Sequence, residues 1–150
     1  MNAFSVFQGA CIFFASSFVG IWLRKRCLRK AAFYRDYAGF LCYALEKIDC
    51  ERMIVAEIIK TFESKSSDFS DLIHDKKCLA PLPDKELDDI RAFIGSIGKT
   101  DAENQIASLR SKSAESSRVT EKMCADLKKE GDLRFKLCVL LGAALFIILV

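Results

Sequence analysis

Few residues in this sequence have a type and spacing that could support catalysis. The one histidine, His74, lies in a polar stretch without a paired carboxylate or cysteine, so no catalytic triad or metal site can be assembled around it. The segment Gly95–Thr100 ends in Gly-Lys-Thr, as a phosphate-binding loop does. That motif, G-x-x-x-x-G-K-[ST], follows a strand and needs a wider gap than the one between Gly95 and Gly98. The sequence therefore predicts a protein that is not an enzyme and has no cofactor, metal or small-molecule substrate.

The seven cysteines form no recognisable framework either. Their number is odd and no pair has the C-x-x-C spacing of a metal or redox site. We expect free thiols that behave as small apolar residues in a reducing compartment. One alternative stays open, which is acylation of Cys27 beside a membrane. The cysteines are Cys11, Cys27, Cys42, Cys50, Cys78, Cys124 and Cys138.

Charged side chains are confined to the middle of the chain. Residues 1–23 and 137–150 carry none, so all 23 basic and 20 acidic side chains lie between them. The uncharged ends are strongly apolar, which favours membrane segments over a second soluble domain. We expect an N-terminal transmembrane anchor over residues 1–23, a cytoplasmic helical domain over 24–136 and a C-terminal membrane segment over 137–150.

The N-terminal apolar run is long enough to cross a bilayer. As a helix, Ala3–Leu23 would span roughly 30 Å, the thickness of the hydrocarbon core. A secretory signal peptide has its positive charges before the apolar run, whereas here a basic cluster follows it. By the positive-inside rule this cluster keeps the middle of the chain in the cytoplasm. Membrane lipid is therefore an expected partner and nucleic acid is not. The cluster consists of Arg24, Lys25, Arg26, Arg29 and Lys30.

The C-terminal apolar run, Leu137–Val150, is shorter. As a helix it covers roughly 21 Å, less than a full span unless the flanking Arg134 and Lys136 extend their charged ends towards the headgroups. A buried core helix is the alternative for so short a run. We expect a membrane segment because the run has no polar face, and the cations before it again place the middle in the cytoplasm.

The middle shows helical periodicity and no strand-like alternation. Its apolar residues recur at steps of three and four, as along Phe33, Tyr37, Phe40, Leu41 and Ala44. The predicted fold class is all-α: a small cytoplasmic helical bundle between an N-terminal transmembrane helix and a short C-terminal membrane helix. Helices are expected over Leu28–Ile48, over Met53–Phe62, around Phe69–Ile73, from Asp84 to Gly98, and from Thr100 onward, the last with a break near Gly131.

One helix boundary carries a distinct motif. Gly98 is a suitable left-handed terminator, and Thr100 with Glu103 has the spacing of a capping box. The helix that follows has a thin apolar stripe, so we expect part of its surface to be exposed or covered by a partner. Asp101 and Gln105 are the candidate partner-binding residues. The alternative is that both only support the local structure.

The segment Ile94–Gln105, read as Ile-Gly-Ser-Ile-Gly-Lys-Thr-Asp-Ala-Glu-Asn-Gln, resembles part of stage III sporulation protein AB. In that family this part reads apolar-Gly-x-Ser/Thr-Asp-x-x-x-Gln. The N-terminal anchor, its basic exit and the charged helix leading to a short terminal anchor agree with the resemblance. It covers most of the chain, is strongest over Leu87–Val150, and departs over Glu63–Pro83, where a tryptophan-bearing helix is missing.

The resemblance implies a non-enzymatic part in endospore formation. Members of the family belong to a secretion-like channel complex in the mother-cell membrane that faces the forespore. The implied partners are other stage III sporulation channel proteins, including the ATPase stage III sporulation protein AA. The family's helical domain is similar to the cytoplasmic domain of type II secretion platform proteins. The alternative is therefore a platform-type adaptor of another secretion or pilus system, although such proteins usually carry two copies of the domain and no repeat is found here.

Overall fold

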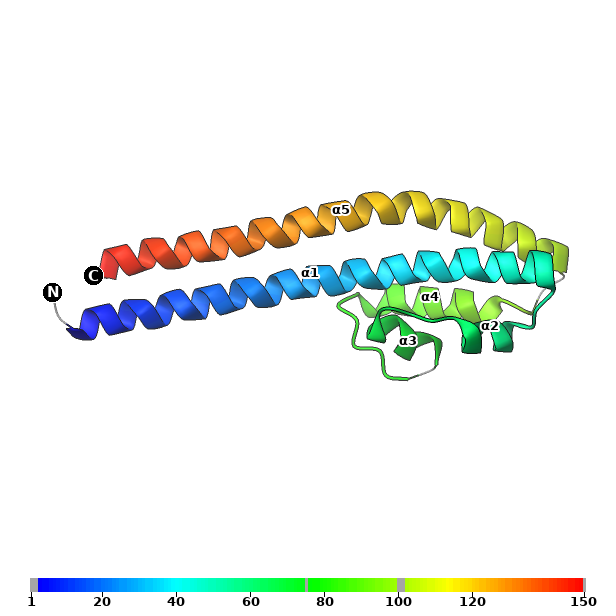
Figure 1. Ribbon diagram of the computed structural model, residues 1–150, viewed down its shortest axis with the longest axis horizontal. Coiled ribbons are helices and arrows are strands. Elements are labelled where there is room, and N and C mark those ends of the chain that lie inside the picture. Colours follow the sequence, from blue (N-terminus) through cyan, green and yellow to red (C-terminus); the bar gives the residue numbers. More distant parts are fainter. Residues whose placement is uncertain (1–2, 75, 100–101, 150) are drawn as a thin grey trace. The chain divides into compact units, whose positions relative to one another are not determined.

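The computed structural model describes residues 3–74, 76–99 and 102–149, with side chains over slightly shorter ranges (Figure 1). All regular secondary structure in these ranges is helical, so the all-α prediction is confirmed at that level. The helices are α1 (Ala3–Glu51), α2 (Val55–Thr61), α3 (Ser67–Ile73), α4 (Asp84–Ser96) and α5 (Ala102–Leu149).

The chain forms two compact units. Unit 1 combines Met1–Leu28 with Ala125–Val150, and unit 2 is the continuous segment Arg29–Cys124. Unit 1 thus contains the first part of α1 and the last part of α5, while unit 2 contains α2, α3, α4 and the remaining parts of α1 and α5. The predicted domain bounds at residues 23 and 136 stay a prediction.

Unit 2 is built around one hydrophobic core to which all five helices contribute. Phe33, Phe40 and Phe69 are completely buried, and their rings meet partly edge to face, the arrangement that the ring quadrupole favours. The apolar stripe predicted on α1 is confirmed, because Phe33, Tyr37, Phe40, Leu41 and Ala44 all face this core. Helix α4 adds Leu87, Ile90 and Ile94 at the spacing expected of one buried face.

Helix α1 continues past Ile48, where the sequence predicted its end. The helix stops at Glu51, and Arg52 adopts a left-handed backbone with φ of +49°. The Met53 N–H then donates to the Lys47 carbonyl at 3.1 Å, which satisfies one of the acceptors left free at the helix end. This reversal starts the chain towards α2, whose Ile58 is fully buried in the core of unit 2.

The break predicted near Gly131 is wrong, because α5 is helical throughout that region. Gly131 is buried, and a Cβ placed on it would lie 3.2 Å from the Cβ of Cys27 and 3.6 Å from the Cα of Arg24. Within unit 1 this glycine therefore lets α5 approach α1 closely. A helical glycine at a close contact removes side-chain bulk and need not end the helix, and the isolated sequence does not distinguish the two cases.

Candidate functional site

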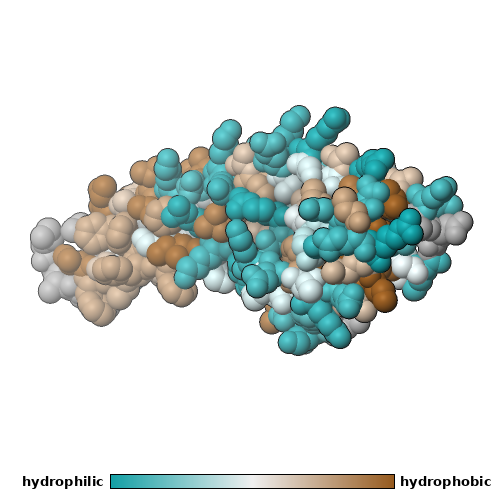
Figure 2. Space-filling model, turned by 45° about the vertical axis from the view of Figure 1, so that its right-hand side comes forward, coloured by the Kyte–Doolittle hydropathy of each residue, from teal (hydrophilic) through white to brown (hydrophobic). Residues whose placement is uncertain are grey.

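The first candidate site is the outer surface of unit 1, which is apolar and exposed. Phe7, Phe14 and Phe18 of α1 are each at least 70% exposed. On the face drawn in Figure 2, tan and brown residues predominate in unit 1 towards the chain ends. A soluble protein seldom exposes so large a contiguous apolar surface. By length and composition α1 is, among the described residues, the one helix that could cross a membrane. The part of α5 in unit 1 adds exposed Leu140, Leu141, Ile147 and Ile148.

The two helices of unit 1 pack antiparallel through small residues. A Cβ placed on Gly20 would lie 3.0 Å from the Cβ of Cys138, and one placed on Gly142 would lie 3.0 Å from the Cβ of Ser16. The Ser16 hydroxyl donates a hydrogen bond to the Cys138 carbonyl. Close approach through glycine and serine is typical of helices that pair in a membrane. Ser16 and Gly20 are four residues apart, a small-x-x-x-small spacing that a sequence can show, whereas Gly142 is a glycine inside an apolar run and gives no such signal.

The basic cluster is divided between the two units. Arg24, Lys25 and Arg26 belong to unit 1. The Arg24 Nε lies 2.8 Å from Asp132 Oδ1 on α5, and the Arg26 guanidinium lies 5.7 Å from the centre of the Trp22 ring. Lys25 is exposed. This region therefore retains cationic side chains directly beside the apolar surface, where they can meet anionic headgroups.

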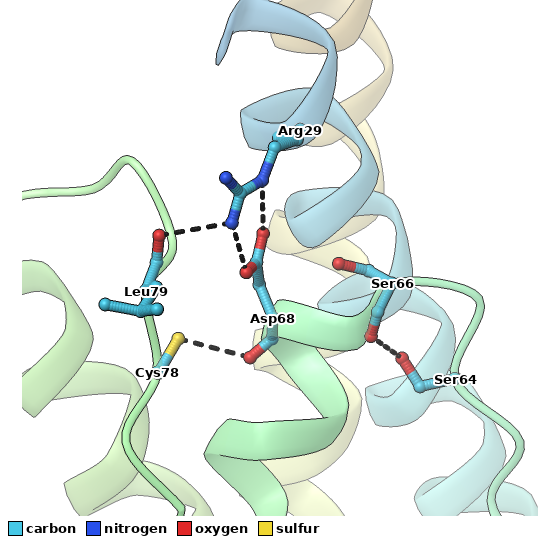
Figure 3. A network of polar contacts seen from close by, with 6 residues as sticks. All are labelled: Arg29, Ser64, Ser66, Asp68, Cys78 and Leu79. Carbon is cyan, nitrogen blue, oxygen red and sulfur yellow. Dashed lines mark hydrogen bonds and ion pairs between the residues drawn. The ribbon is translucent and has the colours of Figure 1, made fainter. Parts of the chain in front are cut away.

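Arg29 is a member of unit 2, where it anchors α3 (Figure 3). Its Nη2 lies 2.6 Å from Asp68 Oδ1 and its Nε lies 3.1 Å from Asp68 Oδ2, a two-pronged contact with a buried carboxylate. The hydrogen bond to Asp68 raises the pKa of Arg29. Arg29 also donates to the Leu79 carbonyl at 3.3 Å, and the Cys78 thiol donates to the Asp68 carbonyl. From the sequence Arg29 was predicted only to be part of the basic cluster that sets the topology, because its partner Asp68 is 39 residues away.

A second buried carboxylate holds the chain just before α3. Asp36 Oδ2 accepts hydrogen bonds from the Ser66 N–H at 2.5 Å and from the Ser64 hydroxyl at 2.7 Å. The Ser64 hydroxyl is also 2.8 Å from the Ser66 carbonyl (Figure 3). Asp36 and Asp68 together fix the loop before α3 and the start of that helix. Lys30, the last residue of the basic cluster, has its Nζ 5.8 Å from the centre of the Tyr34 ring.

Replacing Arg29 with methionine should lower the free energy of unfolding of unit 2 by about 1–2 kcal/mol. The change keeps the aliphatic stem but leaves the Asp68 carboxylate buried without its cation. The cost is below that of a fully buried pair, because half of the Arg29 side chain is exposed and solvent screens the charge. Chemical denaturation of the full chain in detergent measures it. The matched control, Arg91→Met, removes an exposed pair with Asp88 and should cost under ~0.5 kcal/mol. Equal effects of the two variants would show that Arg29 does not hold α3 in place through Asp68.

The structure describes only part of the terminator and capping-box motif at the α4–α5 boundary. Gly98 has φ of +93°, the left-handed backbone suited to a terminator, and α4 ends at Ser96. Thr100 and Asp101 lie outside the described residues, so the capping box and the partner contact of Asp101 stay predictions. Glu103 is exposed. Gln105 is only 9% exposed, so its expected place on an exposed surface is wrong. The turn of α5 that carries Gln105 packs into unit 2, which periodicity along one helix does not show.

The second candidate site is a groove of about 380 Å³ on unit 2, between α1, α4 and α5. Its base includes Tyr34 and Tyr37, both buried, and the buried Ile90. Its walls are apolar where Phe93, which is half-buried, and Val119, which is exposed, line them. The volume lies in the range of sites that bind small ligands or side chains of a partner. Nothing in the sequence signals this groove, because its three walls come from distant parts of the chain.

Acidic side chains line the groove. Glu86, Asp89 and Glu115 contribute three carboxylates, against the single ammonium group of Lys112. The Tyr34 hydroxyl donates a hydrogen bond to Glu86. Burial is the main cause that raises the pKa of Tyr34, and this hydrogen bond raises it further. Burial, and then the charge of Glu115, raises the pKa of Tyr37 to about 12. Both tyrosines therefore stay protonated and neutral at physiological pH, and the net charge of the groove is negative.

No protein-family model matches the chain, and comparisons with curated proteins and with solved structures find no match.

Proposed function

We propose that this protein is a non-enzymatic, membrane-anchored helical adaptor. The observation that carries the proposal is the exposed apolar surface of unit 1, with Phe7, Phe14 and Phe18 outermost on α1. Exposing these side chains to water would cost roughly 25 cal/mol for each Å² of apolar surface, and a bilayer removes that cost. Unit 2, by contrast, buries Phe33, Phe40 and Phe69 in a core of its own.

The proposal includes the C-terminal segment as a second membrane element. Its support is the antiparallel packing of Gly142 on Ser16 and of Cys138 on Gly20 within unit 1. A segment that packs along a membrane helix and exposes Leu141 and Ile148 itself needs an apolar environment. The cations Arg24, Lys25 and Arg26 support an orientation in which unit 2 lies in the cytoplasm.

A narrower assignment follows from the resemblance of Ile94–Gln105 to stage III sporulation protein AB. On this proposal the protein lies in the mother-cell membrane facing the forespore. There it links the secretion-like channel complex to the cytoplasmic ATPase stage III sporulation protein AA. Deletion of the gene in a spore-forming source organism should lower the number of heat-resistant spores, while vegetative growth stays normal. Normal spore numbers would overturn the narrower assignment and leave the anchoring proposal standing.

Thiol labelling tests the anchoring and its orientation. Cys42 and Cys50 are exposed on unit 2 and serve as natural reporters. The protein should stay with the membrane after alkaline carbonate extraction, and a membrane-impermeant maleimide should label it only after the cells are permeabilised. A Cys42→Ser, Cys50→Ser variant controls for labelling at other thiols. Release by carbonate would refute the anchoring, and strong labelling of these two thiols in intact cells would refute the orientation.

A further inference from the structure

The groove on unit 2 is elongated along two helices. On α4 its lining residues Glu86, Asp89, Ile90 and Phe93 follow the spacing i, i+3, i+4, i+7, so they form one continuous face over two turns. On α5 the lining runs from Lys112 to Met123. At 1.5 Å per residue the α5 wall is roughly 16 Å long. That length corresponds to about three turns of a helix lying along the groove.

Size and lining together restrict what can occupy the groove. Val119 is 49% exposed in the middle of the α5 wall, where an apolar side chain from a partner would cover it. Ser116 and Thr120 are small and would let a second helix lie close to α5. An elongated apolar channel of this kind fits the apolar face of an amphipathic helix, whose anchors recur at i, i+3, i+4 and i+7.

The charge of the groove decides the chemistry of the occupant. Asp89 and Glu115 are exposed on opposite walls, one on α4 and the other on α5. Lys112, the one cation among the described lining residues, has its Nζ 3.2 Å from Glu115 Oε2 in an exposed pair that solvent screens, so two of the three carboxylates have no cation beside them in the groove. A helix with acidic flanks would meet repulsion from both walls, whereas lysine or arginine flanks would meet a carboxylate on each side. Complementary charge of this kind favours one class of partner and rejects the opposite one.

We propose that this groove binds a short basic amphipathic helix, about three turns long, belonging to a cytoplasmic partner protein. The inference rests on the adaptor function proposed above and adds to it the chemistry and location of the partner contact. The apolar face of the partner helix lies over Tyr37, Phe93 and Val119, and its basic flanks pair with Asp89 and Glu115. The charge of the groove determines selectivity, and the apolar base supplies most of the binding.

The probe is a fluorescein-labelled synthetic helical peptide with leucine at i, i+3, i+4 and i+7 and lysine on its flanks. A second peptide has glutamate in place of every lysine. The full chain is held in phosphatidylcholine nanodiscs, and empty nanodiscs correct for peptide that binds lipid. Fluorescence anisotropy should show saturable binding of the lysine peptide and at least about tenfold weaker binding of the glutamate peptide. Absence of saturable lysine-peptide binding up to about 1 mM would overturn the proposal.

Matched variants test where the peptide binds. Asp89→Asn with Glu115→Gln should weaken lysine-peptide binding about tenfold, whereas Asp88→Asn with Glu121→Gln, on the same helices but outside the groove lining, should change it less than about twofold. Val119→Arg, at an exposed position, should also weaken it about tenfold without changing the thermal unfolding of unit 2. Equal effects of the two charge pairs, or an unaffected Val119→Arg variant, would show non-specific attraction and overturn the proposal.

Two further outcomes separate this inference from the adaptor function. If a Val119→Cys variant forms a disulfide-linked dimer whose yield falls on adding Asp89→Asn, the occupant is a second copy of this chain, and the partner helix is refuted. Carbonate extraction and maleimide labelling do not depend on the groove. Loss of peptide binding with normal anchoring therefore refutes only the groove inference, whereas failure of anchoring refutes the adaptor.

Discussion

Truncating Phe69 to alanine is expected to lower the free energy of unfolding of unit 2 by about 3–5 kcal/mol. Phe69 is fully buried on α3, and its ring centre lies 5.5 Å from that of Phe33 and 5.8 Å from that of Phe40. Its removal leaves a cavity at the point where α1 and α3 meet, and the rings around it lose edge-to-face contacts. The aromatic rings paired with it are those of Phe33, Tyr37, Phe40 and Phe62.

Circular dichroism of the full chain in detergent micelles measures this effect. For a domain of this size each kcal/mol shifts the midpoint by roughly 4–8 °C, so a fall of well over ~10 °C is expected. The matched control is Phe18→Ala, since Phe18 is 72% exposed on unit 1 and contributes nothing to the core of unit 2. The control should leave the unfolding of unit 2 unchanged. A midpoint for Phe69→Ala within a few degrees of wild type would show that the core is not closed around this ring.

The second large effect is expected at Gly98, which should not tolerate a β-branched residue. Valine at Gly98 should destabilise unit 2 by about 3 kcal/mol, for two separate reasons. Its φ of +93° places any side chain in a strained backbone conformation. A Cβ there would also lie 3.1 Å from Val55 Cγ2, so the Val55 side chain would have to shift by a few tenths of an ångström. Gly98→Ala keeps the strain but adds less bulk, and its expected cost is about 1–2 kcal/mol.

Gly95 provides a control with the opposite sign. It lies in α4 with an exposed backbone, and a Cβ placed on it would meet nothing within 4 Å. Gly95→Ala should therefore stabilise the helix by about 0.5–1 kcal/mol, through the lower entropy of alanine in the unfolded chain. Thermal unfolding of both alanine variants in the same micelles decides between the roles of the two glycines. Stabilisation by Gly98→Ala would show that this position does not require left-handed backbone.

The helices and the main core face could be predicted from the sequence. The stripe from Phe33 to Ala44 and the Ile90–Ile94 face follow from a period of 3.6 residues, which is a local property of the chain. The apolar run of α1 likewise depends only on consecutive residues. Gly98 could be assigned to a left-handed position because glycine alone adopts it at little cost. In each of these cases the information lies within a few turns of the residue concerned.

Tertiary contacts decided the rest. Gln105 faces the interior of unit 2, Arg29 pairs with Asp68 across 39 residues, and Gly131 serves a helix contact with Cys27. The groove exists only because the faces of α4 and α5 that carry Asp89 and Glu115 meet beside Tyr37 of α1. Each of these features depends on which helix faces which, and that pairing results from burying one shared core. Periodicity along a single helix contains no information about its neighbour, so the sequence predicted the elements and the tertiary structure decided the contacts.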